Sequence, residues 1–168
     1  MALLDWTLAE SVVGIVLSFY ILREFLRWKL HPFNSPAIVW VLHLALFWLP
    51  LGLFVGSLME IAEYVYKTNF LFAEIHLLVL GFLTTVLIGF GTRVTLGHSG
   101  QAPHADRIAI ALFWWTQVIV FLRLVLSIDS GLMGAHEWLF DAAAFGWIML
   151  FIVWGGRYGK TLIYGKQR

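Results

Sequence analysis

Five long apolar segments, separated by short polar ones, constrain this chain more than any other feature. About 20 apolar residues cross the ~30 Å hydrocarbon layer of a bilayer, and each segment approaches that length. Only 12% of the 168 residues are charged, whereas a soluble domain carries about 25%. The pattern predicts an all-α integral membrane protein, because a helix satisfies its backbone hydrogen bonds inside lipid. We predict one transmembrane domain over residues 1–168, a bundle of five helices over residues 6–22, 37–58, 70–90, 108–128 and 138–154.

Turn-forming residues set the predicted helix ends. The fourth span is expected to stop at Asp129-Ser130-Gly131, and the fifth at Gly155-Gly156. The segment from Thr92 to Gly100 mixes polar and small residues directly after the third span, so we predict a loop there. Its glycines permit positive φ. Two alternatives follow for His98: the loop folds back and brings it to the mouth of the bundle, or the loop is an ordinary cytoplasmic loop.

The basic residues predict an orientation. Nine of the 11 Lys and Arg follow the first span, lie between the third and fourth, or occupy the C-terminal tail. Lys67 and Arg123 are the exceptions, and acidic residues occupy the other loops. By the positive-inside rule, the N-terminus is outside and the C-terminus is cytoplasmic.

The absence of cysteine limits the metal chemistry to imidazole, thioether and oxygen ligands. Basic residues lie at segment ends rather than in a patch, which argues against nucleic-acid binding. No nucleophile-and-base motif or phosphate-binding loop is present, so a redox reaction is the one enzymatic activity left open.

The histidines fall into two layers when each is placed by the 1.5 Å helical rise. His76 and His136 lie near the outer face, and His43 lies near the inner level of His98 and His104. From His76 to His98 the distance is roughly 25–30 Å, too far for one metal or haem. Alternatively, these histidines are interhelical hydrogen-bonding groups, His136 is an interfacial polar residue, and His31 and His104 are solvated.

Arg123 is predicted at the same outer level as His76 and His136. A buried cation in a membrane requires an anionic partner. Glu74, Asp141 or the propionates of a haem between His76 and His136 would serve. Arg123 either takes this buried role or extends to the outer headgroups.

The stretch from His76 to Gly100 resembles the signature of the NnrS family. Its matching parts are His76-Leu77-Leu78-Val79-Leu80-Gly81, Thr84-Thr85 and Thr92-Arg93-Val94-Thr95-Leu96-Gly97-His98-Ser99-Gly100. Weaker similarity extends the resemblance to about residues 36–168. Members are bacterial haem- and copper-containing membrane proteins of the nitric oxide response. Typical members are about twice as long, and this chain resembles their C-terminal part.

The resemblance implies roles for particular residues. His76 and His98 become the first candidates for metal or haem ligands, His43 becomes the third, and Arg93 becomes a supporting cation. Ligands normally supplied by the other half of the family fold would come from a second copy or a partner subunit.

These observations favour a protein of the bacterial inner membrane that binds haem b, with copper as a second metal. We expect a cytochrome b-like subunit of a respiratory or redox complex, with His76, His136, Arg123 and Arg93 at the cofactor. A non-redox assembly or anchoring subunit is the alternative. A small transporter is a weaker one, because no inverted repeat is visible.

Overall fold

The computed structural model describes residues 2–28 and 35–165, and every regular element in them is helical. The third predicted span is one continuous helical rod in which the short helix α3 passes into the π-helix η2 and then into α4. The elements are α1 (Ala2–Arg27), α2 (Ala37–Tyr66), α3 (Ala73–His76), η2 (Leu77–Thr84), α4 (Thr85–His98), α5 (Arg107–Leu132) and α6 (Trp138–Tyr164).

Four helical stretches are long and apolar enough to cross a membrane. They are Ala37–Tyr66, Ala73–His98, Arg107–Leu132 and Trp138–Tyr164. The all-helical, multi-pass architecture therefore agrees with the prediction from sequence. A fifth crossing by α1, and the direction of the bundle in the bilayer, stay predictions.

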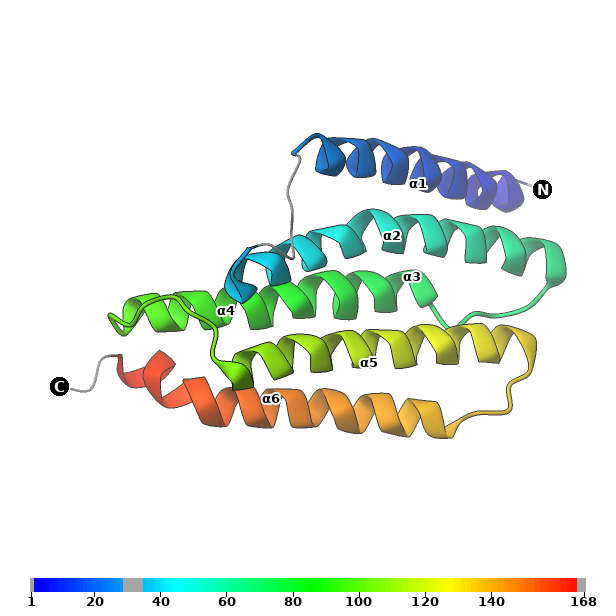
Figure 1. Cartoon of the computed structure of the whole chain (residues 1–168). Helices are drawn as coiled ribbons and strands as arrows, with labels where there is room; N and C mark the ends of the chain where they lie inside the picture. Colours follow the sequence, from blue (N-terminus) through cyan, green and yellow to red (C-terminus); the bar gives the residue numbers. More distant parts are fainter. Residues whose placement is uncertain (1, 29–34, 166–168) are drawn as a thin grey trace.

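Successive helices run in alternate directions, so the beginning of α1 and the end of α6 lie at opposite ends of the bundle (Figure 1). Charge follows the same division. At the basic end lie Arg23, Arg27, Arg93, Arg107, Arg157 and Lys160, and at the acidic end lie Glu60, Glu63, Glu74, Asp129 and Glu137. The separation is incomplete, because Glu24 and Asp106 lie at the basic end and Lys67 lies at the acidic end.

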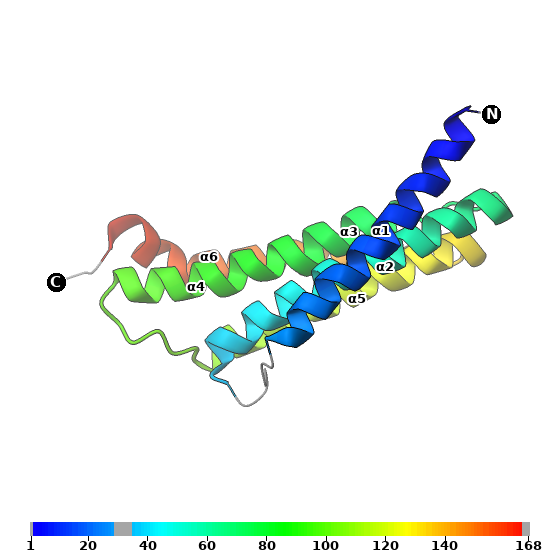
Figure 2. The same cartoon turned by 90° about the horizontal axis from the view of Figure 1, so that it is seen from above.

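Helix α1 is peripheral. Among the described elements it packs against α2 alone, and Figure 2 shows it crossing the bundle obliquely. Small polar residues make the contact: Ser11 donates to Glu60 (2.8 Å), and Ser18 donates to the carbonyl of Pro50 (2.7 Å). Close approach of two helices through small residues is typical of membrane packing.

Small residues of the third span allow it to pack closely against α2. Gly81 lies against the Trp48 ring, and a Cβ there would approach its Cγ to 2.8 Å. Gly89 meets Val41 in the same way. The hydrophobic core of the bundle includes Val41 together with aromatic residues such as Trp40 and Phe113.

Three predicted helix ends are wrong, because packing outweighs local turn propensity. Residues from Thr92 to His98 are helical rather than a loop, and Thr92 donates its hydroxyl to the Ile88 carbonyl one turn earlier. Helix α5 continues through Asp129-Ser130-Gly131 to Leu132. Helix α6 continues past Gly155-Gly156 to Tyr164, with Tyr158 buried. Glycine is common in membrane helices and does not end them there.

Asp106 caps the beginning of α5. Its Oδ1 accepts the backbone N–H of Ala109 (2.8 Å), and Arg157 of α6 donates to its Oδ2 (2.9 Å). The Ala109 hydrogen bond and then the Arg157 hydrogen bond lower the pKa of Asp106 below its usual value. A lowered pKa means that this stabilisation is present above the ordinary carboxyl pKa and is lost as pH falls through the folded-state value.

Replacing Asp106 by alanine is expected to cost about 1 kcal/mol of stability near neutral pH, the usual value of an N-cap. Thermal unfolding in detergent measures this, and the difference from wild type should shrink as the pH falls through the lowered pKa of Asp106. Glu137→Ala is the matched control, because Glu137 precedes α6 without a side-chain capping bond. Equal losses in the two variants would contradict the assignment.

Candidate functional site

His76 and Arg123 meet at the acidic end of the bundle. His76 ends α3, and Arg123 lies on α5. Arg123 Nη2 donates to His76 Nε2 over 2.5 Å, and both side chains are half-buried. The π-helix η2 begins at the residue after His76. Because π segments are rare and concentrate at functional sites, this junction is the first place to look for function.

The turn that precedes His76 is conformationally unusual. Leu71 and Phe72 both have positive φ, 47° and 53°, which side-chain-bearing residues rarely adopt. Two side chains hold the turn: Asn69 Oδ1 accepts the Leu71 N–H (2.8 Å), and Glu63 Oε1 accepts the Phe70 N–H. The direction of α3, and hence the position of His76, is fixed by these contacts.

The hydrogen bond to Arg123 determines the tautomer of His76. Arginine only donates, so His76 Nε2 accepts, and the neutral imidazole carries its proton on Nδ1. That Nδ1 is buried and makes no hydrogen bond of good geometry among the described residues. The backbone of Leu71 and Phe72, in the turn before His76, lies close enough to interact with the ring.

Arg123 has no carboxylate partner within the described chain. Its guanidinium carbon lies 5.2 Å from the centre of the Phe140 ring, a cation–π contact. Neither predicted partner forms an ion pair with it: Glu74 packs against Gly56 of α2, and Asp141 is exposed. The positive charge therefore lies in a candidate span without an anion from these residues.

Three carboxylates line a cavity of about 200 Å³ at the same end of the bundle, although neither His76 nor Arg123 lines it. Glu60 and Glu63 come from α2, and Glu74 comes from α3. Glu60 accepts from Ser11 (2.8 Å), and Glu63 accepts from the Phe70 backbone. Two of the three are thus occupied in holding α1 and the turn before α3.

His136 is exposed and bound to Asp129 rather than to His76. It lies in the turn between α5 and α6, where its Nδ1 is 2.7 Å from Asp129 Oδ1. Asp129 also accepts the backbone N–H groups of Ala135 and His136. The contact organises the turn, and the structure does not bring the two histidines together.

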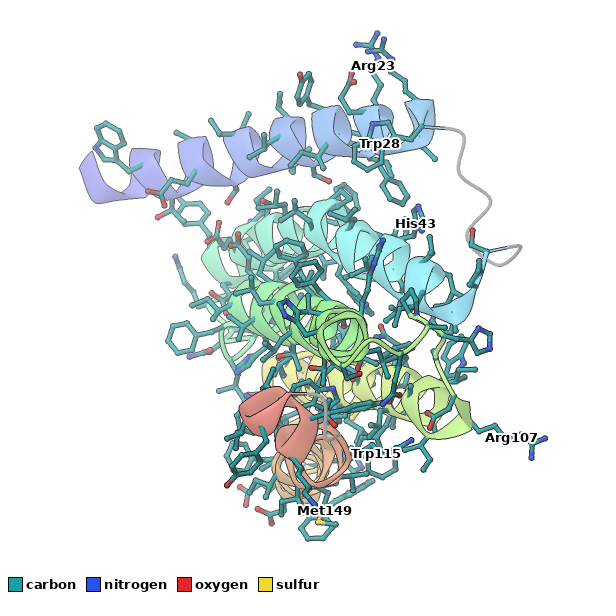
Figure 3. The ribbon with its side chains drawn as sticks, turned by 90° about the vertical axis from the view of Figure 1, so that its left-hand side faces the viewer. Arg23, Trp28, His43, Arg107, Trp115 and Met149 are labelled. Carbon is teal, nitrogen blue, oxygen red and sulfur yellow. The ribbon has the colours of Figure 1, made fainter. Side chains whose placement is uncertain are left out.

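The remaining predicted ligands lie toward the basic end. Half-buried His43 places Nδ1 2.9 Å from the Val39 carbonyl of its own helix, and Figure 3 shows it on the side of α2 toward α1. Arg93, His98 and His104 are exposed, and His31 lies outside the described residues. His76 and His98 sit at opposite ends of one continuous rod, which confirms their separation.

The comparison with known families supplies the identity of the group. The model of the family described as NnrS protein matches residues 1–165. The chain belongs to the NnrS family. The match includes α1, which the motif between His76 and Gly100 did not reach. No curated protein and no solved structure matches the chain.

Membership places this NnrS protein among the membrane proteins of the nitric oxide response. The motif on which the sequence resemblance rests lies on the rod formed by α3, η2 and α4 and in the turn after it. The rod carries His76 at the acidic end and Arg93 with His98 at the basic end. A single site therefore cannot include both His76 and His98.

The described residues of this NnrS protein suit haem better than copper. One axial imidazole from a protein is enough to hold haem iron, and His76 would supply one beside a guanidinium that suits propionates. No group of three His, Asp or Glu able to hold a metal ion occurs in the described ranges. A copper site would therefore need ligands from a second copy or a partner subunit.

A polar network in the middle of the NnrS bundle was not anticipated from the sequence. Trp48 donates to Gln117 (2.6 Å), and Gln117 donates to Thr85 (3.2 Å). Nearer the basic end, Trp154 donates to Thr92 (3.0 Å). Gln117 could have indicated this network, because it is a polar amide within an apolar run of the sequence. These bonds fix the rotation of the central rod that positions His76.

Proposed function

We propose that this NnrS protein binds haem b through His76 and acts as a cytochrome b-like subunit of a redox assembly in the bacterial inner membrane. The observation that supports the proposal is the His76–Arg123 pair: a half-buried imidazole beside a cation that has no carboxylate partner among the described residues. A haem propionate would supply the missing anion.

The chain's own residues would contribute three things to a haem site: an iron ligand, a positive charge and a proton at a defined atom. His76 would hold the iron through Nε2, which requires that Arg123 give up its hydrogen bond to that atom. The imidazole proton then stays on Nδ1. Arg123, kept nearby by the Phe140 ring, would neutralise a propionate. Haem at this position would supply a one-electron centre and an open coordination position for a diatomic such as nitric oxide.

The protein partner is part of the proposal. His76 lines neither the carboxylate cavity beside it nor the two larger apolar hollows along α5 and α6. We therefore place the haem between this chain and a second copy or a partner subunit, which would also complete any copper site. Copper would then be held jointly by the two chains.

A spectrum of the full chain, purified from cells supplied with haem, tests the proposal. We expect a Soret band and a dithionite-reduced α-band, with about one haem per one or two chains by metal analysis. Carbon monoxide should shift the reduced spectrum if the haem takes its one axial imidazole from a single chain. Colourless protein from haem-replete cells would reject the proposal.

A non-redox assembly subunit is the second candidate, and the hydrogen bonds that the histidines make within this chain favour it. His43, His76 and His136 each contact a polar group of this chain. Under that function, colourless protein would co-purify in fixed ratio with a larger complex. Alanine at His76 would then weaken assembly without any spectral change.

A further inference from the structure

An apolar groove runs along the outer face of α5 and α6, on the side away from the His76–Arg123 pair. Its volume is about 480 Å³. Ala111 and Trp115 line it from α5, and Phe145 and Met149 line it from α6. Arg107 lies at its mouth at the basic end, and Figure 3 shows that side chain reaching away from the bundle.

The groove is a defined feature rather than a loose gap between helices. Trp115 donates its indole N–H to the Gly146 carbonyl over 2.9 Å, which fixes the ring between the two helices. Gly146 is buried, and a Cβ there would come within 3.3 Å of Ile119. The close approach at Gly146 closes the groove near Trp115, which lies about eight residues, or roughly 12 Å, along α5 from Arg107.

The charge at the mouth is available. Asp106 precedes Arg107 in sequence, but its carboxylate is bound by Arg157 and by the Ala109 N–H. Arg107 is exposed and forms no ion pair with any residue that the structure describes. A free guanidinium at the end of an apolar, membrane-facing groove is complementary to a phosphate that carries an acyl chain.

We propose that the α5–α6 groove binds an anionic phospholipid, with one acyl chain between Trp115 and Phe145 and the phosphate on Arg107. The apolar lining provides affinity for the chain, and Arg107 provides preference for a headgroup of net negative charge. Binding would tie α5 to α6 along the length of the groove. The site is separate from His76 and does not depend on haem.

Native mass spectrometry of the full chain in detergent tests the proposal, with dioleoylphosphatidylglycerol and dioleoylphosphatidylcholine as competing probes. We expect one bound lipid and about fivefold preference for phosphatidylglycerol, the contribution of one basic residue near an anionic surface. Arg107→Gln should abolish the preference. Arg93→Gln is the control, because Arg93 is an exposed cation of the basic end outside the groove.

A second pair of variants tests the acyl chain. Ala111→Phe fills the groove and should reduce binding of both lipids several-fold. Val118→Phe, at an exposed position of α5 outside the groove, should leave binding unchanged. Unfolding temperatures show whether each variant is folded. Preference retained in Arg107→Gln, or lipid retained in Ala111→Phe, would overturn the proposal, as would a dimer that Ala111→Phe dissociates, since a second copy would then occupy the groove.

Discussion

Replacing His76 by alanine is expected to abolish the Soret band of the purified protein. His76 is the imidazole that contacts Arg123 among the described residues. If it is the axial ligand, no other histidine at this place can take over its role. The measurement is haem per chain, from the reduced spectrum and from pyridine haemochrome. Imidazole added to the His76→Ala protein should restore part of the band by entering the vacated position.

The controls separate ligation from folding. His43→Ala and His98→Ala change histidines nearer the basic end and should retain haem at the wild-type ratio. His76→Ala leaves the Arg123 guanidinium without its hydrogen-bond partner, which could itself destabilise the protein. The double variant with Arg123→Met removes that charge as well. A Soret band that survives in folded His76→Ala protein would place the haem elsewhere.

Replacing Gly56 by alanine is expected to destabilise the protein by about 1–3 kcal/mol, the usual cost of overpacking. A Cβ at Gly56 would lie 2.4 Å from the Cβ of Glu74 and 3.1 Å from its Cα. Since backbone as well as side chain is in the way, α2 and α3 must separate. Thermal or denaturant unfolding in detergent measures the loss.

Gly155→Ala is the matched control for that experiment. Gly155 lies inside α6, and a Cβ at this position would have no neighbouring heavy atom within 4 Å. Alanine there should be neutral or slightly stabilising, because it favours the helix more than glycine does. An equal decrease in both variants would show that the Gly56 contact does not limit the packing of α2 on α3.

The helical spans could be predicted from the sequence because a helix that crosses lipid needs a continuous run of apolar residues. It did not predict their ends, because the local signals at Gly155-Gly156 and at Asp129-Ser130-Gly131 are overruled by packing. Tyr158 is buried beyond the first pair, and within the second signal Gly131 lies against the Phe70 ring. A turn signal in a membrane helix is therefore weak when partner helices continue past it.

The sequence predicted the depth of the site residues along the helices, whereas the contacts between their side chains could be learned only from the structure. Helical rise alone placed Arg123 near His76, and the structure confirms that proximity. Rise carries no information about which way a side chain points, so the Asp129 contact of His136 was not foreseen. The positive φ at Leu71 and Phe72 has no local sequence signal, since neither residue is glycine or asparagine.

The π-helix η2 lets the rod hold extra chain without changing the directions of its side chains. Each π turn contains more residues than an α turn, so removing one residue between Leu77 and Thr84 would return the segment to α geometry and the wider turn would absorb the loss. Residues beyond it would keep their directions, so Thr85 would still meet Gln117 and Gly89 would still meet Val41. The same deletion between Thr85 and Gly89, in α4, has no wide turn to absorb it and would rotate everything beyond by about 100°. A single-residue deletion should therefore damage the protein less in η2 than in α4.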